Sequence, residues 1–122
     1  MRLEVIKINQ TEIAEIISDE LVIQNVAEAT DLLGDIYYQG YDQVIIYEKN
    51  ISPEFFDLKT KIAGEILQKF SMYRVSLFIV GDVSRYENKS LKDFIFESNK
   101  GKHVNFLSSR EAVVEAFSKT NQ

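Results

Sequence analysis

Carboxylates, one lysine and a few hydroxyl groups are the side chains of this sequence that could do chemistry. The chain has no cysteine and a single histidine, His103, which excludes disulfides, thiolate catalysis and His-rich or Cys-based metal sites. No sequence neighbour could orient His103 as a general base, so we expect it to be an exposed, structural residue. Because the sequence also has no nucleophile elbow, phosphate-binding loop or dinucleotide fingerprint, no cofactor is expected and an enzyme is the less favoured class.

The candidate binding residues follow the carboxyl ends of the expected strands, at an edge of the sheet that we call the carboxyl rim. Ligands of open α/β sheets bind at this edge. The candidate ligand- or partner-binding residues are Asp19, Glu48, Lys49, Asn50, Ser52, Glu54, Asp57, Asp82 and Ser84. Lys49 beside a helix start could hold a phosphate or carboxylate, because free backbone N–H groups point outward there.

Three other interpretations of residues at the rim remain open. Ser52 and Ser108 could merely cap their helices, which is the more usual role of serine at a helix terminus. Asp19, Glu48, Asp57 and Asp82 could supply oxygen ligands to Mg²⁺, although their spacing matches no metal signature. Glu48, Asp57 and Asp82 could also act as acid–base groups in a minor enzyme hypothesis.

Apolar periodicity and turn residues predict the elements that position these groups. Strands are expected at 3–8, 13–17, 44–47, 74–80 and 104–107, and helices are expected at 25–40, 52–70, 90–101 and 108–117. The helix starts rest on Asn25, Ser52-Pro53, Ser90 and Ser108, each at a capping position. The order β-β-α-β-α-β-α-β-α predicts one α/β domain over residues 1–118, with a frayed tail at 119–122. Its sheet should be mixed and mostly parallel, flanked by helices, with an antiparallel first strand after a turn at Asn9-Gln10.

Charge is unevenly distributed along the 122 residues, which carry a net charge of −5. Residues 12–57 contain eleven acidic residues and one basic residue, whereas residues 84–110 contain six basic residues and three acidic ones. Opposite acidic and basic faces could steer a charged partner or an antiparallel self-association, but intermixing of the charges in three dimensions is the favoured interpretation. The net acidity disfavours a nucleic-acid partner.

Apolar runs are too short for membrane insertion. The longest clean run is 77–80, far below the roughly 20 residues that span a bilayer. The first residues also lack the roughly 7–15 uninterrupted apolar positions of a signal peptide. We therefore expect a cytoplasmic protein with no membrane association.

Several stretches resemble an uncharacterised bacterial family, a domain of unknown function described as STAS-like. They are 48–50, 54–60, 62–70, 80–82 and 90–101. The element order is similar to that of the STAS domain, the fold of bacterial anti-sigma factor antagonists. The first resemblance implies no established activity, and the second implies a fold and a regulatory class.

The phosphorylation switch of regulatory STAS domains is not supported by the motif. In those domains the modified serine lies in an Asp-Ser-Ser/Thr-Gly stretch at the start of the helix after the third strand. Here Leu58 follows Asp57, and no glycine occurs until Gly64. Ser52 or Thr60 could serve instead, and the sequence leaves this open.

These observations predict a non-enzymatic regulatory or protein-interaction module of the bacterial cytosol. The expected surface is the start of the second helix, near 52–57, with the adjacent rim. A protein partner or self-association is expected, and the tyrosines at 37, 38, 41, 47, 73 and 86 could be partly exposed at such an interface. The alternative is a domain that binds a small anionic ligand or nucleotide at the carboxyl rim and the amino terminus of the helix that starts at Ser52.

Overall fold

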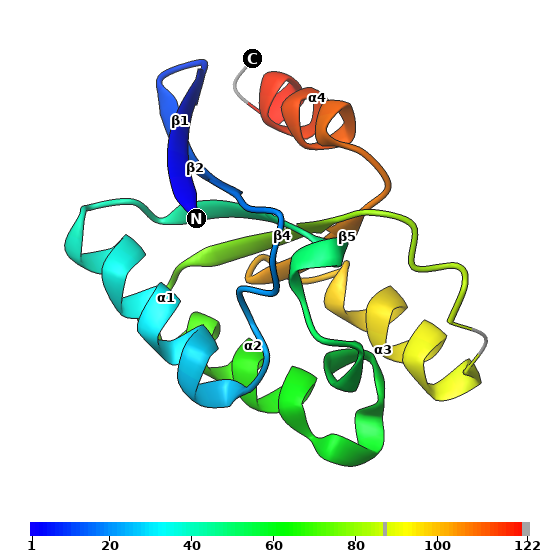
Figure 1. Ribbon diagram of the computed structural model, residues 1–122. Coiled ribbons are helices and arrows are strands. Elements are labelled where there is room, and N and C mark those ends of the chain that lie inside the picture. Colours follow the sequence, from blue (N-terminus) through cyan, green and yellow to red (C-terminus); the bar gives the residue numbers. More distant parts are fainter. Residues whose placement is uncertain (87, 121–122) are drawn as a thin grey trace.

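Five strands form one mixed sheet in the computed structural model, which describes residues 1–86 and 88–120 (Figure 1). The strands are β1 (Arg2–Ile8), β2 (Thr11–Ile17), β3 (Gln43–Tyr47), β4 (Ser76–Val80) and β5 (Val104–Leu107). Their spatial order is the sequence order, β1-β2-β3-β4-β5; β1 pairs antiparallel with β2, and every other pairing is parallel. This confirms the predicted α/β class and the mostly parallel sheet, and it supplies the strand order that the sequence leaves open.

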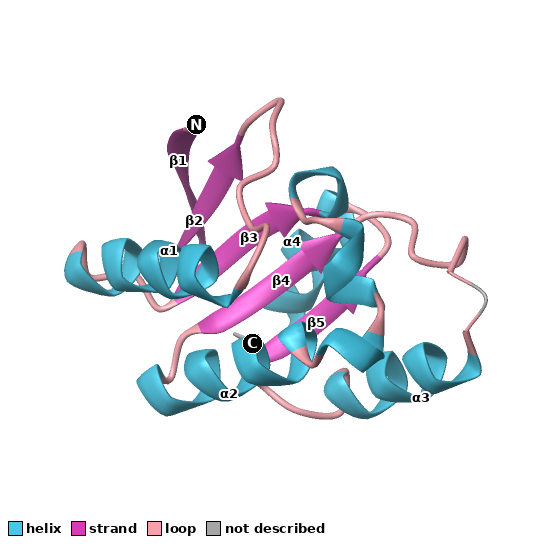
Figure 2. Cartoon of the chain, turned by 60° about the horizontal axis from the view of Figure 1, so that its bottom comes forward, coloured by secondary structure: helices cyan, strands magenta, loops and turns pink. Residues whose placement is uncertain are grey.

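Three helices cover one face of the sheet and a fourth lies on the other (Figure 2). They are α1 (Val26–Tyr38), α2 (Ile62–Tyr73), α3 (Lys89–Ser98) and, on the opposite face, α4 (Arg110–Thr120). Each of the first three connects neighbouring parallel strands, and right-handed crossovers in the same direction place them on the same side. Helix α4 includes two residues of the tail predicted at 119–122, and positions 121–122 lie outside the described residues.

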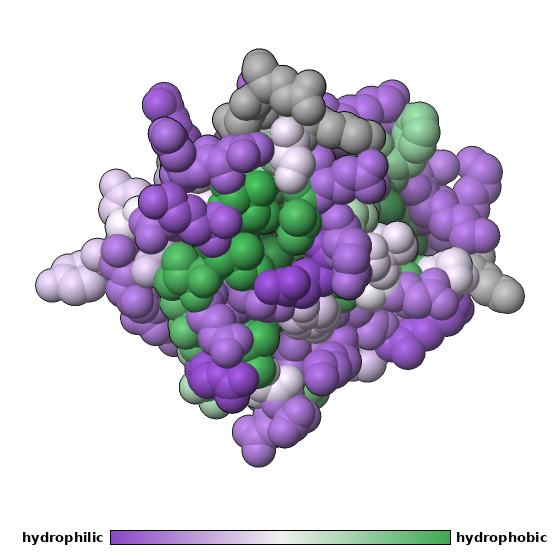
Figure 3. Space-filling view, turned by 90° about the horizontal axis from the view of Figure 1, so that it is seen from above, coloured by the Kyte–Doolittle hydropathy of each residue, from purple (hydrophilic) through white to green (hydrophobic). Residues whose placement is uncertain are grey.

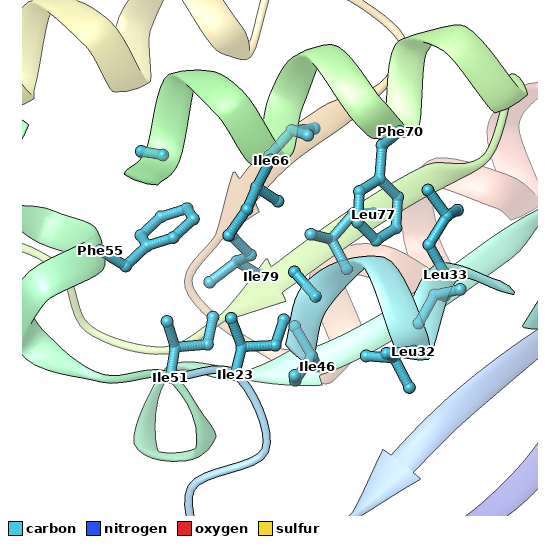
Figure 4. Packing of buried hydrophobic residues seen from close by; sticks show 14 of the residues in the cluster. Ile23, Leu32, Leu33, Ile46, Ile51, Phe55, Ile66, Phe70, Leu77 and Ile79 are labelled. Atoms are coloured by element: carbon cyan, nitrogen blue, oxygen red, sulfur yellow. The ribbon is translucent and has the colours of Figure 1, made fainter. Parts of the chain in front are cut away.

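Strand alternation divides the apolar residues between two clusters. In β3, Val44 and Ile46 pack toward α1 and α2, while Ile45 packs toward α4. Because both faces of the central strands are buried, their apolar runs are continuous. Figure 4 shows the larger cluster, in which Ile46, Leu77 and Ile79 of the sheet lie near side chains of α1, α2 and the connecting segments.

The smaller cluster lies between the sheet and α4. Ile8, Ile13, Ile45, Phe78 and Val80 of the sheet pack with Val113 of this helix. Seen from the side of the β1–β2 hairpin and α4, apolar residues still reach the surface and are surrounded by polar ones (Figure 3).

Backbone conformation confirms several of the predicted turns and caps. Asn9 and Gln10 have φ angles of 48° and 74°, as a two-residue hairpin turn of type I′ requires. The Asn25 side chain accepts a hydrogen bond from the Glu28 backbone N–H at 2.9 Å, and α1 is followed by Gly40 with φ of 90°.

The predicted long helix from Ser52 is wrong. Two short 3-10 turns, Pro53–Phe56 and Leu58–Thr60, precede α2, which begins only at Ile62. The Thr60 hydroxyl donates to the backbone carbonyls of Glu54 and Asp57, both at 2.8 Å, and the Asp57 carboxylate accepts from the Lys59 backbone N–H at 3.1 Å. These side-chain bonds offer the backbone an alternative to the helical pattern and stabilise the turns.

Two other helix starts and one strand start differ from the prediction. Asn88, not Ser90, caps α3 by accepting from the Leu91 N–H at 3.2 Å, and Ser109, not Ser108, caps α4 by accepting from the Ala112 N–H at 3.1 Å. Strand β4 begins two residues late because Arg74, with φ of 56°, ends α2 in the left-handed conformation.

Candidate functional site

Glu48 is the most enclosed acidic residue of the predicted carboxyl rim. Its carboxylate, 8% exposed, forms an ion pair with Arg85 and accepts a hydrogen bond from the Tyr86 hydroxyl at 3.2 Å. Both partners come from the segment that follows β4. The network therefore joins the ends of the two neighbouring strands β3 and β4.

Gly81 lets the backbone after β4 approach Glu48. A Cβ atom at position 81 would lie 2.7 Å from the Glu48 Cβ, and the Gly81 φ of 150° is one that other residues rarely adopt. This close contact places the following residues, including Arg85, over the Glu48 carboxylate.

The Arg85 guanidinium lies over the Tyr86 ring, and both side chains contact the Glu48 carboxylate. The hydrogen bond to the Tyr86 hydroxyl, followed by the charge of Glu48, raises the pKa of Arg85 above its ordinary value. The Arg85 guanidinium lies 5.1 Å from the Tyr86 ring centroid, and that ring stacks on Phe56 at 4.5 Å. The arginine stays charged, and its charge is directed at Glu48.

Asp82 and Ser84 form a local turn beside this network. The Ser84 hydroxyl and backbone N–H both donate to the Asp82 carboxylate, and these bonds lower the pKa of Asp82. Both residues are exposed.

Asn50 holds the β2–α1 connection against the rim. It is fully buried, and its amide donates to the carbonyls of Ser18 and Glu20, both at 2.8 Å. Its main-chain carbonyl accepts from the N–H groups of Val22 and Ile23 at 2.7 and 3.1 Å, whereas its side-chain Oδ1 is buried without a hydrogen-bond partner among the described residues. These four bonds hold Asn50 and the connection in place, and none of them involves the Asn50 Oδ1 atom.

Ser52 and Asp57 cap the 3-10 turns. The buried Ser52 hydroxyl accepts from the Glu54 N–H at 3.3 Å, and Asp57 accepts from Lys59. The long helix expected to start at Ser52 is replaced by a turn of four residues, which lacks the aligned N–H groups of a long helix, so an anion there would depend on side chains such as Lys49. Thr60 donates to two carbonyls, so neither of the two hydroxyls suggested for phosphorylation is free of local contacts.

Lys49, Asp19 and Glu54 are exposed candidates of the rim, as are Asp57, Asp82 and Ser84. The Lys49 ammonium forms no ion pair within residues 1–86 and 88–120. In the same part of the chain, no three acidic or histidine side chains form a group that could hold a metal ion. Asp19, Glu48, Asp57 and Asp82 are therefore not brought together as the Mg²⁺ hypothesis requires.

The sequence reasoning missed a second polar network, on the α4 side of the sheet. Glu15 of β2 is 4% exposed, accepts a hydrogen bond from the Tyr47 hydroxyl, and accepts another from Arg110 Nε at 3.2 Å. Burial, together with the Glu15 hydrogen bond, raises the pKa of Tyr47 to about 12. An acidic residue inside an apolar strand was the available signal, but Arg110 lies 95 positions away along the chain.

We expect this network to make the free energy of unfolding fall as the pH rises in the alkaline range. Because the Tyr47 pKa is raised from 10.0 to about 12 in the fold, the neutral phenol contributes stability below pH 10 that is lost as the pH rises toward 12. The loss should be about 1–2 kcal/mol after allowance for solvent screening. Urea unfolding between pH 8 and about 12 should show this loss in the native chain and not in Tyr47→Phe. A constant difference between the two proteins over that range would contradict the assignment.

Ion pairs neutralise much of the basic C-terminal third. Between positions 84 and 110, four of the six basic residues are paired: Arg85, Lys89, Lys100 and Arg110. Of the eleven acidic residues at 12–57, Glu15 and Glu48 form ion pairs within the described part of the chain, and the others form none there. The acidic surface remains, whereas the basic one is reduced, which further weakens a nucleic-acid interpretation.

The arrangement at the carboxyl rim favours structural roles for its buried members. Glu48, Asn50 and Ser52 are held by internal bonds. Reacting groups need a positioned partner and access to substrate, and the exposed Lys49, Asp19 and Glu54 side chains form no ion pair that would position them among the described residues.

The fold and the site define a single-domain α/β protein. Its parallel strands lie side by side in sequence order, and the buried polar side chains of the rim form hydrogen bonds within the protein. The chain matches the family described as Domain of unknown function (DUF4180) over residues 8–117, and it belongs to this family. No curated protein and no solved structure matches it. Within the described part of the chain, none of the helices combines the length and apolarity needed to cross a membrane.

Proposed function

We propose that this protein is a non-enzymatic regulatory module of the bacterial cytosol that acts by binding another protein, and that its fold is related to the STAS domain. The element order supports the relation to STAS. The internal bonds of Glu48, Asn50 and Ser52 support a binding role over a catalytic one, because these groups are already engaged.

The observation that carries this proposal is an exposed cluster of large side chains where α1 and α2 end. Tyr37 and Tyr38 are 57% and 92% exposed, and Met72 and Tyr73 are 67% and 47% exposed. We call these four residues the Tyr–Met patch. The Tyr37 and Tyr73 rings are in edge-to-face contact at 5.5 Å, which joins the two helix ends into one surface. Tyrosine and methionine are enriched at protein interfaces, and exposed apolar clusters of this kind mark interaction sites.

The surroundings of the patch suggest the charge of the partner. Asp31, Asp35 and Tyr38 share one stripe of α1 by their spacing of four and three residues, and α1 contains no basic residue. On the α2 side, Lys69 and Arg74 are exposed beside the two patch residues of this helix. The protein that binds here is therefore one that presents an apolar centre with basic residues facing α1 and acidic residues facing α2.

A paired substitution tests this proposal. We expect Tyr38→Ser combined with Met72→Ser to reduce binding of the partner at least tenfold, since central aromatic residues often carry most of the binding energy. The matched control is Phe96→Ser, which removes a side chain that is 63% exposed on α3, away from the patch. Tagged chains would be used for quantitative affinity capture from cells of the natural host. A partner lost with the patch variant and retained by the control is the expected result.

Two outcomes would contradict the proposal. One is the absence of any protein whose capture depends on the patch. The other is turnover or tight binding of a metabolite at the rim that Lys49→Ala abolishes. The latter would favour the alternative, an anionic ligand or nucleotide at the carboxyl rim, which stays a prediction that rests on Lys49.

A further inference from the structure

A cavity of about 290 Å³ opens between α2 and α3, at the amino end of β5. Its apolar wall comes from Leu67 of α2, Phe94 of α3 and Val104 of β5. Because the parallel strands run in the same direction, this cavity lies at the edge of the sheet opposite the carboxyl rim. Its volume is near the lower end of the range for small-molecule pockets.

His103 also lines this cavity and has an unsatisfied polar atom. The sequence predicts an exposed histidine, but the residue is half-buried, and its Nδ1 atom is buried without a hydrogen-bond partner among the described residues. Its backbone carbonyl accepts from the Leu77 N–H at 2.7 Å, which fixes the main chain at this position. Buried polar atoms without a partner are uncommon and call for an explanation, and a bound ligand supplies one.

The charge at the cavity is positive on balance. The Glu97 carboxylate is paired with Lys100 at 3.3 Å, whereas Lys102 has no ion-pair partner within residues 1–86 and 88–120. The Lys102 backbone carbonyl accepts from the Ser76 hydroxyl at 2.7 Å, so this residue, too, is held by its main chain.

We propose that this cavity binds a small carboxylate whose apolar body has the size of a single ring or a branched aliphatic chain. The body packs against Leu67, Phe94 and Val104, and the carboxylate accepts hydrogen bonds from the Lys102 ammonium and from the N–H of His103 Nδ1. This site is separate from the Tyr–Met patch, and it does not depend on the proposed protein interaction.

The test uses three probes: phenylacetate, benzoate and 4-methylpentanoate. Each would be titrated into the ¹⁵N-labelled chain and followed by amide chemical shifts. We expect at least one probe to bind with a dissociation constant on the order of 1 mM, as small fragments do, with shifts concentrated at 67 and 94–104. Phenylacetamide, the neutral analogue of phenylacetate, should bind at least fivefold more weakly than phenylacetate.

Substitutions separate the carboxylate contact from the general charge of α3. Lys102→Met should weaken binding of the carboxylate about tenfold and leave binding of phenylacetamide unchanged. Lys92→Met, which removes an exposed charge on α3 that does not line the cavity, should change the affinity less than twofold. Leu67→Trp should fill the cavity and abolish binding, with thermal unfolding as the check that the variant is folded.

Three results would overturn this inference. The first is the absence of chemical-shift changes with all three probes at 10 mM, about ten times the expected dissociation constant. The second is chemical-shift changes located away from the cavity. The third is an equal loss of affinity for the carboxylate in Lys102→Met and Lys92→Met.

Discussion

Replacing Asn50 with alanine is expected to lower the free energy of unfolding by about 3 kcal/mol. The substitution removes two hydrogen bonds and leaves the Ser18 and Glu20 carbonyls without these donors at a fully buried position. The volume that the side chain occupied adds the free-energy cost of a small cavity. The connection between β2 and α1 should loosen where the amide bonds to Ser18 and Glu20 are lost, while the main-chain bonds of residue 50 and the Ser52 N–H bond to the Ile23 carbonyl remain.

Urea unfolding of the variant and of Lys49→Ala provides the comparison. Lys49 is the exposed neighbour of Asn50 and should change stability by less than about 0.5 kcal/mol. Equal stability of the two variants would mean that Asn50 does not have the structural role described, and it would return this residue to the list of candidate ligand contacts.

Gly81→Ala is expected to destabilise the fold by a similar amount, about 3 kcal/mol. The new Cβ would lie 2.7 Å from the Glu48 Cβ, and the backbone φ of 150° adds strain for any residue with a side chain. The segment that carries Arg85 would move away from Glu48, which would leave a buried carboxylate without its ion pair.

A double substitution separates the steric effect from the backbone strain. Glu48→Gly combined with Gly81→Ala removes the clashing atom, so the second substitution should cost less in this background than in the native chain. Gly64→Ala is the matched control, since no atom lies within 4 Å of its added Cβ and the helical position favours alanine by up to about 1 kcal/mol. Additive effects of the two substitutions at the rim would contradict the close contact as the cause.

Apolar periodicity was sufficient to predict the elements and their order. The central strands are apolar on both faces, and a single turn at Asn9-Gln10 links the first two. The element from Ser52 was wrong because Ser-Pro-Glu starts a 3-10 turn as readily as an α-helix. The Thr60 and Asp57 side chains keep this segment from continuing as an α-helix, because they form hydrogen bonds to the backbone of the folded turn.

The sequence predicts where the carboxyl rim lies, but it does not predict which side chains of the rim contact one another. Glu48, Asp82 and Ser84 were chosen from their positions after strands, and the structure brings Glu48 near the segment that contains Asp82 and Ser84. Arg85 and Tyr86, which enclose Glu48, were missed because no periodic pattern marks the segment after β4. Pairing across 37 residues becomes visible only when β3 and β4 are adjacent.

All six tyrosines are at least partly exposed, as predicted, but to different degrees. Tyr37, Tyr38 and Tyr73 are exposed, whereas Tyr41, Tyr47 and Tyr86 are half-buried. The difference depends on which face of the sheet or helix layer each ring meets. That is fixed by the strand order, which the sequence does not determine.

Site-specific photocrosslinking at position 38 is the measurement that tests the central claim most directly. A photoreactive phenylalanine analogue would replace Tyr38 in cells of the natural host, and the same analogue would replace Phe96 as the control, since both side chains are exposed. If the Tyr–Met patch binds a protein partner, irradiation should give a discrete crosslinked species from position 38 and none from position 96. No crosslink from either position, or the same species from both, would contradict a binding surface at the ends of α1 and α2.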